Sequence, residues 1–236
     1  MMPDLSERPI TDAGTAPRAL RVVIVVLVSA VAAGLGYVLL SLPQAAPGLS
    51  QAVETHMSQS GVSHPVTAVL LNFRGYDTLL EIVVLLLALM GVWAVAGMAH
   101  YRDDAPGPVL DTLARLLVPV LILVAAYLLW VGAQAPGGAF QAGSVLGAAG
   151  VLLLLAGWRP HFALLALPLR VLLIIGPAAF VTMALLTLLS EGRLLTYPVA
   201  HAGVLILILE TAATLSIGVT LAALFLGGQP PERQDP

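Results

Sequence analysis

The sequence contains no cysteine and no lysine, and only 10% of its 236 residues are charged. Without cysteine, the chain has neither a disulfide framework nor a cysteine-ligated zinc or iron–sulfur site, and no cofactor is expected. All ten basic residues are arginines, they form no basic run, and the net charge is -3. Because nucleic-acid binding requires grouped cations that neutralise phosphates, this distribution argues against a nucleic-acid partner.

Polar residues are too few to cover a water-soluble domain. Hydrophobic residues make up 59% of the sequence, and the mean hydropathy is +0.98, far above that of an ordinary globular chain. Spans of about 20 apolar residues are needed to cross a hydrocarbon core of ~30 Å. We therefore predict an all-α, polytopic membrane protein in the lipid bilayer, with six transmembrane helices over residues 19–42, 78–98, 110–131, 138–157, 162–189 and 199–227.

The arginines also predict how the chain is oriented. With six spans both termini share a side, and most of the arginines fall in segments on that side. Basic residues are retained in the cytoplasm, so we expect a multi-pass protein of the bacterial inner membrane with both termini cytoplasmic. Residues 1–18 are polar and contain several prolines and a glycine, so they are expected to be a flexible tail, and residues 228–236 are expected to be a C-terminal tail.

Two carboxylates and an arginine lie at the predicted outer mouth of the second span. Asp77 and Glu81 are one helical turn apart, and Arg74 precedes them. Glu81 is either a carboxylate that passes protons or coordinates sodium, or part of a solvated helix start favoured by the helix dipole. For Asp77 the structural interpretation is favoured, since Arg74 can neutralise it. Glu81, one turn deeper, is the first candidate for an ion path, and Asp77 the weaker one.

Two further charges lie within predicted spans. Arg170 enters the fifth span from the inner side and Glu210 enters the sixth from the outer side, each by about ten residues, so at 1.5 Å per residue both are expected near mid-membrane. An arginine alone in hydrocarbon costs about 2.5–3.5 kcal/mol on insertion scales, so a partner is expected. The two residues either form an ion pair between helices or belong to a proton or sodium relay. No histidine or lysine lies nearby to continue a relay, which favours the pair.

Glycine and proline predict a tight turn between the third and fourth spans. Pro136 ends one helix, while Gly137 and Gly138 let the backbone turn into the next. Phe140 and Gln141 are expected to anchor the turn at the membrane interface. Small residues over 143–150 then recur at spacings of three and four, a pattern that permits close helix approach. The sequence leaves open whether that face meets this chain or a partner.

Three local features have structural interpretations. Asp111 and Arg115 are four residues apart at the start of the third span and predict an ion pair. Pro168 and Pro177 bracket Arg170 and predict a kink in the fifth span. The histidines fall in loops or near span ends without HxxxH or HExxH spacing, so no metal site is predicted.

Two stretches resemble known sequences. Residues 64–81, HPVTAVLLNFRGYDTLLE, resemble the segment VNVILVDFRGFDTLGE at the C-terminal end of the large subunit of Mrp-type sodium/proton antiporters, which also occurs in membrane-bound hydrogenase subunits. Residues 111–115, followed by GAQAPGGAFQAG over 132–143, resemble the pattern of the MnhB family of the same antiporters, in which LRTVAR leads to GHNAPGGGFQGG. Ala133 and Gln134 stand where that family has His-Asn, and Ala139 replaces a glycine, so this loop lacks the titratable histidine of the family pattern.

The resemblance implies a fusion of a two-helix segment over 19–107 with an MnhB-like four-helix domain over 108–227. It also implies a non-enzymatic membrane subunit of an Mrp-like antiporter, whose partners are other membrane subunits of the complex, protons, and Na+ or another monovalent cation. The glutamate matching Glu81 is a candidate ion-path residue in the large subunit. Two alternatives remain: a membrane-arm subunit of a hydrogenase-like or respiratory redox-coupled pump, and a purely structural scaffold.

Overall fold

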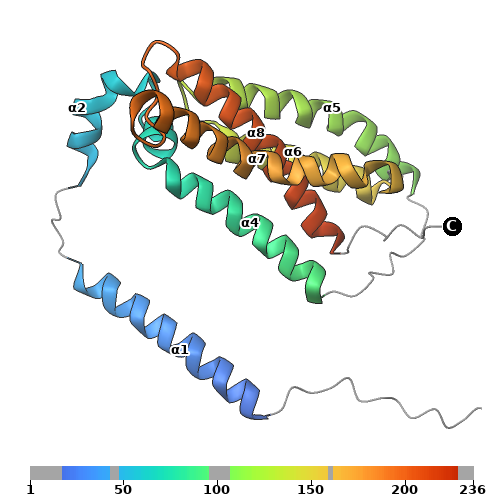
Figure 1. Ribbon diagram of the computed structural model, residues 1–236. Coiled ribbons are helices and arrows are strands. Elements are labelled where there is room, and N and C mark those ends of the chain that lie inside the picture. Colours follow the sequence, from blue (N-terminus) through green and yellow to red (C-terminus); the bar gives the residue numbers. More distant parts are fainter. Residues whose placement is uncertain (1–17, 43–47, 96–106, 159–161, 228–236) are drawn as a thin grey trace, which may run out of the picture. The chain divides into compact units, whose positions relative to one another are not determined.

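The computed structural model describes residues 18–42, 48–95, 107–158 and 162–227. All regular secondary structure in these ranges is helical (Figure 1), which confirms the predicted fold class. The predicted tails lie outside the described residues, apart from Arg18 at the start of the first helix. The last part of the predicted two-helix segment, residues 96–106, also lies outside them.

Five of the described helices are long and apolar enough to cross a membrane: α1 (Arg18–Ser41), α4 (Gly75–Val95), α5 (Pro108–Val131), α7 (Phe162–Glu191) and α8 (Ala202–Leu226). A sixth apolar helix, α6 (Ala139–Leu155), has 17 residues. At 1.5 Å per residue it is about 26 Å long, slightly less than a hydrocarbon core of ~30 Å. Each predicted span therefore corresponds to one helix, with ends shifted by a few residues.

The chain forms two compact units, Met1–Gly48 and Leu49–Pro236. The first unit contains α1, and nearly all of the side chains described on that helix are exposed. A helix that is apolar on every face and has no neighbour within its own unit is suited to contact with lipid or another protein.

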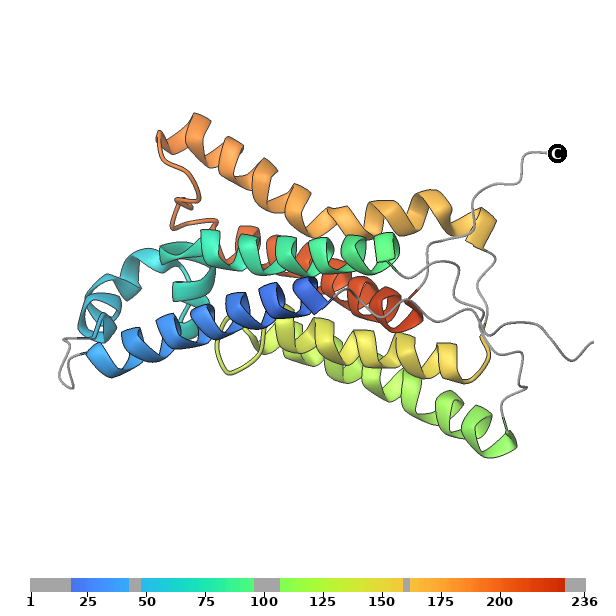
Figure 2. The ribbon, with the colours of Figure 1, turned by 90° about the horizontal axis from the view of Figure 1, so that it is seen from below.

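Helix α8 is the centre of the second unit. It packs against α4, α5, α6 and α7, and 56% of its span is buried, more than in any other described span. Figure 2 shows α8, in red, running between α7 and the α5–α6 pair. Buried side chains on several faces of α8 explain why it is apolar all round rather than amphipathic.

Glycines on α6 allow that helix to approach α8 closely. A Cβ atom on Gly143 would lie 2.8 Å from the Cβ of Ile217, and one on Gly147 would lie 3.0 Å from the Cβ of Leu221. A methyl group at either position would push the helices apart, as expected for a small-residue packing face. The predicted face over 143–150 therefore meets α8 of this same chain.

Helix α7 continues through Pro177 because α8 supplies a replacement hydrogen bond. Proline has no N–H, so the Leu173 carbonyl one turn earlier loses its helical partner. The Ser216 hydroxyl donates to that carbonyl at 2.6 Å, and Gly176 makes room, since a Cβ there would lie 2.8 Å from the Ser216 Cβ. Figure 2 shows the predicted bend near the middle of α7.

Candidate functional site

The segment before α4 forms three short helical pieces. Helix α2 (Ser50–Ser60) is followed by α3 (Pro65–Ala68) and the π-helix η1 (Val69–Phe73). Because η1 ends at Phe73 and α4 begins at Gly75, these pieces form a segment of their own before the second span. Thr67, Ala68 and Leu71 are buried, so protein covers one face of the segment.

Hydrogen bonds dock this segment on the end of α5. The N–H groups of Ser63 and His64 both donate to the Ala133 carbonyl, at 3.2 and 3.1 Å. The Thr67 hydroxyl donates to the Gly132 carbonyl. These carbonyls lie just beyond α5, where helical partners are lacking, and the docked segment satisfies them.

A second hydroxyl joins η1 to α4. The Thr78 hydroxyl donates to the Leu70 carbonyl at 2.7 Å. A single turn of π-helix shifts the backbone hydrogen-bond pattern, and such turns are frequent at functional sites. Thr67 and Thr78 each donate their only hydroxyl proton to a carbonyl, but each oxygen keeps its capacity to accept.

The turn between α5 and α6 is as tight as predicted. The Gly138 N–H donates to the Leu128 carbonyl at 2.9 Å, and the Gly138 φ of +104° lies in a region that favours glycine. Phe140 is partly buried and packs against the buried core, whereas the neighbouring Gln141 is exposed. Their expected place at the membrane interface stays a prediction.

Arg74 and Asp77 form the predicted ion pair at the start of α4. Their side chains are 61% and 41% exposed, and exposed pairs contribute about 0–1 kcal/mol, so their role is local. The predicted pair between Asp111 and Arg115 is also confirmed, at 2.9 Å. Glu81 has no part in either ion pair, and its side chain is also exposed.

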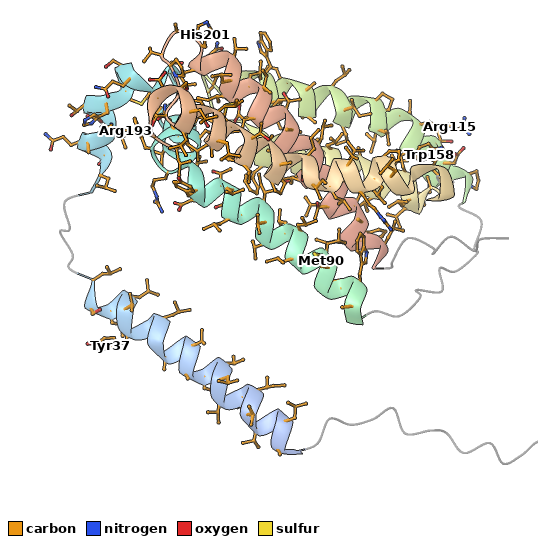
Figure 3. All side chains as sticks on the ribbon, in the orientation of Figure 1. Tyr37, Met90, Arg115, Trp158, Arg193 and His201 are labelled. Atoms are coloured by element: carbon orange, nitrogen blue, oxygen red, sulfur yellow. The ribbon has the colours of Figure 1, made fainter. Side chains whose placement is uncertain are left out.

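A cavity of about 440 Å³ lies beside Glu81. Its walls come from α3 and η1, the start of α4, the α5–α6 turn, and α8. Glu81 and Glu210, which are far apart in the sequence, both line it, together with the polar side chains of Thr67, Thr78 and Gln141. None of the described residues that line it is basic. In Figure 3 the α7–α8 connection, which carries Arg193 and His201, lies at one end of the second unit, and Arg115 and Trp158 lie at the other.

Glu210 is the most deeply buried charged side chain among the described residues, at 3% exposure. The backbone amide of Ala139 hydrogen-bonds to its carboxylate, whereas Oε2 is buried and has no partner among the described residues. Ala139 is the first residue of α6, so the carboxylate lies at a helix N-terminus, where partial positive charge stabilises an anion. A Cβ atom on Gly138 would lie 2.7 Å from Oε1, so glycine is needed for this approach.

Arg170 does not pair with Glu210, which corrects the favoured interpretation. The bond between Ser216 and Leu173 sets the register of the antiparallel helices α7 and α8. Arg170 lies three residues before Leu173 on α7, and Glu210 lies six residues before Ser216 on α8. Because the two helices are antiparallel, Arg170 and Glu210 lie on opposite sides of this bond. At 1.5 Å per residue they are about 13 Å apart along the helix axes. Helix α7 has 30 residues, and Arg170 lies in its first third. The Arg170 side chain is exposed.

Three residues that line the cavity were missed as candidates. Thr67 and Thr78 stand out only as polar residues beside apolar ones, and Gln141 lay within the turn motif without a predicted partner. Their shared location depends on the fold of α3 and η1. No sequence spacing indicates that these elements converge on α8.

Family and structure comparisons cover nearly the whole chain. Residues 109–226 match a family model described as a domain related to the MnhB subunit of Na+/H+ antiporter, and residues 16–106 match the model for MbhE, a subunit of MBH. The uncharacterized protein MJ1307 of Methanocaldococcus jannaschii is 30% identical over 134 residues, or 48% of this chain. The match covers 50% of that relative, so the chain spans about half its length.

Two solved complexes contain a chain of the same fold. A chain of the membrane-bound sulfane sulfur reductase (MBS), an archaeal respiratory membrane complex, has a TM-score of 0.65 and 24% identity, covering 89% of this chain and 97% of that one. A chain of the Mrp complex from Dietzia sp. DQ12-45-1b has a TM-score of 0.63 and 23% identity, covering 94% and 27%. Because the MnhB model matches half of the sequence, this chain belongs to the MnhB family, and it carries an MbhE domain before the MnhB domain.

Proposed function

We propose that this protein is a membrane subunit of a multisubunit Mrp-like cation/proton antiporter, in which it contributes to assembly and to part of an ion path. The observation that carries the proposal is the position of Glu81. This carboxylate belongs to the MbhE part of the chain, and it lines a cavity completed by the turn and helix of the MnhB part. The cavity is lined mostly by apolar residues, and the two carboxylates that these parts bring to it are suited to passing protons and Na+.

Exposed apolar faces support a role within a larger assembly. Helices α5 and α7 expose large side chains away from α8, including Leu116, Leu123, Tyr127, Trp130, Leu185 and Leu189. Lipid or other membrane subunits of the complex would cover these faces. A path across the whole membrane needs further polar groups, and partner subunits would supply them.

The other candidate residues contribute less to this proposal. Asp77 is neutralised by Arg74, and its pairing at the helix start needs no ion. Arg170 does not line the cavity, and its exposed side chain is suited to contact with a partner subunit or a lipid headgroup. Glu81 is therefore the principal residue of the proposed path.

A redox-coupled pump is the second candidate function. It is favoured by the MbhE match and by the likeness to a chain of a respiratory complex that aligns over nearly its full length. In that case the same subunit would serve ion movement driven by electron transfer in other subunits. A scaffold without any ion role is the third interpretation, and replacement of Glu81 distinguishes it from the other two.

Flux measurements in vesicles that contain the complete complex test these functions. An imposed Na+ gradient is expected to move protons without any electron donor if the complex is an antiporter, and only with a donor if it is redox-coupled. Glu81→Gln should lower that flux in either case, while Glu191→Gln, an exposed glutamate at the end of α7, should not. Normal flux in an assembled Glu81→Gln complex would favour the scaffold.

A further inference from the structure

Two threonines whose hydroxyl protons are already donated line the cavity beside Glu81. Thr67 and Thr78 are buried, and their hydroxyl protons are donated to the carbonyls of Gly132 and Leu70. A hydroxyl oxygen that donates its proton still has lone pairs to offer. Neither threonine needs a further acceptor of its own. The Thr67 oxygen also lies 3.4 Å from His64 Nδ1, so Thr78 has the more available lone pairs.

The Glu210 carboxylate adds a charge that the described part of the chain does not balance. It is almost wholly buried, and its Oε2 has no hydrogen-bond partner there. An ionised carboxylate is costly to bury unless it is paired. The N-terminus of α6 offers about half of a positive charge, so the helix offsets only part of that cost.

None of the described side chains around the cavity supplies the missing positive charge. The lining residues include no arginine or histidine. His64 contacts the lining residue Thr67, with 3.4 Å between His64 Nδ1 and the Thr67 hydroxyl oxygen, but does not itself line the cavity. Arg74 lines the neighbouring hollow between α2 and η1 and is paired with Asp77. A cation from solution is the remaining way to neutralise Glu210 while it is ionised.

We propose that Glu81, Glu210, Thr67 and Thr78 together form a binding site for one monovalent cation such as Na+. Hard cations prefer carboxylate, carbonyl and hydroxyl oxygens, and the Gln141 side-chain carbonyl can complete the set. One monovalent ion neutralises the single deeply buried charge, and Glu81 provides the more accessible ligand. The choice of Na+ as the ion rests on the proposed function. The site also adds Glu210, a ligand from α8, to the proposed ion path.

Equilibrium binding of radioactive sodium ions to the purified complete complex tests the site. The native complex is compared with Glu81→Gln, Glu210→Gln and the matched control Glu191→Gln. Each cavity variant is expected to weaken one sodium site by about 10-fold or more, as when residues that support a bound metal are replaced. The control should bind as the native complex does. Thr78→Ser should keep binding, and Thr78→Val should weaken it.

Native-like binding in an assembled Glu210→Gln complex would overturn the proposal. If the Glu210→Gln complex does not assemble, Glu81→Gln and the two Thr78 variants test the site instead. Native-like sodium binding in both Glu81→Gln and Thr78→Val would also overturn the proposal. Displacement of sodium by far lower concentrations of Ca2+ or Mg2+ would overturn the assignment to a monovalent ion. Sodium binding can be measured without transport, so the two proposals can fail separately. If the cavity variants bind sodium weakly but the native complex shows no antiport, the binding site is supported and the proposed function is rejected. If the complex shows sodium-coupled flux but every variant binds sodium as the native complex does, the proposed function is supported and the binding site is rejected.

Discussion

The hydrogen bond between Ser216 and Leu173 should carry more energy than an ordinary bond between membrane helices. Ser216→Ala removes the donor and leaves a buried carbonyl that Pro177 prevents from finding a partner in its own helix. Interhelical bonds in membrane proteins average about 0.6 kcal/mol and reach about 1.7 kcal/mol. Because the Leu173 carbonyl has no alternative helical donor, we expect a loss near the upper end, about 1.5 kcal/mol.

A double-mutant cycle isolates this effect. Pro177→Ala restores an N–H that can bond the Leu173 carbonyl, so Ser216→Ala should cost only about 0.5 kcal/mol in that background, a coupling of about 1 kcal/mol. Unfolding of the protein in mixed micelles by SDS titration, followed by circular dichroism, measures each step. The control is Ser144→Ala, because the exposed Ser144 hydroxyl bonds its own helix at Phe140 and its loss should cost within about 0.5 kcal/mol.

Equal losses for Ser216→Ala in the two backgrounds would refute the reasoning. That result would mean that the bond does not compensate for the missing N–H of Pro177. A larger loss in the Pro177→Ala background would also contradict it, since the restored helical bond should make the serine less important.

Three other predictions follow from the packing and turns. Gly147→Leu should destabilise the protein by about 1–3 kcal/mol in the same titration by overpacking the α6–α8 contact; unchanged stability would contradict the close approach. Thr67→Val should cost about 1–2 kcal/mol and speed amide exchange at Ser63 and His64, and unaltered exchange would argue against the docking role. Burial raises the pKa of Tyr197, so its hydroxyl stays protonated, and it has no partner among the described residues. Tyr197→Phe should therefore leave stability equal or higher, and a loss above about 1 kcal/mol would contradict this.

Features that depend on local spacing could be predicted from the sequence. The spans follow from long apolar runs, because a membrane requires continuous helices of a set length. The ion pairs of Arg74 with Asp77 and of Asp111 with Arg115 follow from helical periodicity. The turn at 136–138 follows from the backbone properties of proline and glycine.

Features that depend on how helices dock could not be predicted in this way. Glu81 and Glu210 share a cavity because α4 packs on α8 and because η1 folds back beneath them, and no pattern in the chain specifies that register. The supposed pairing of Arg170 with Glu210 failed for the same reason. Counting residues from predicted span ends gives depth only when a helix is straight and of ordinary length, and α7 is long and bent at proline.

Sodium-driven proton flux through the complete complex, compared between the native protein, Glu81→Gln and Glu81→Asp, tests the central claim most directly. If Glu81 lies on the ion path, Glu81→Gln should lower the flux by about 100-fold, within the range expected when a positioned proton-transfer group is lost, while Glu81→Asp keeps a measurable part of it. Native flux in an assembled Glu81→Gln complex would contradict the account.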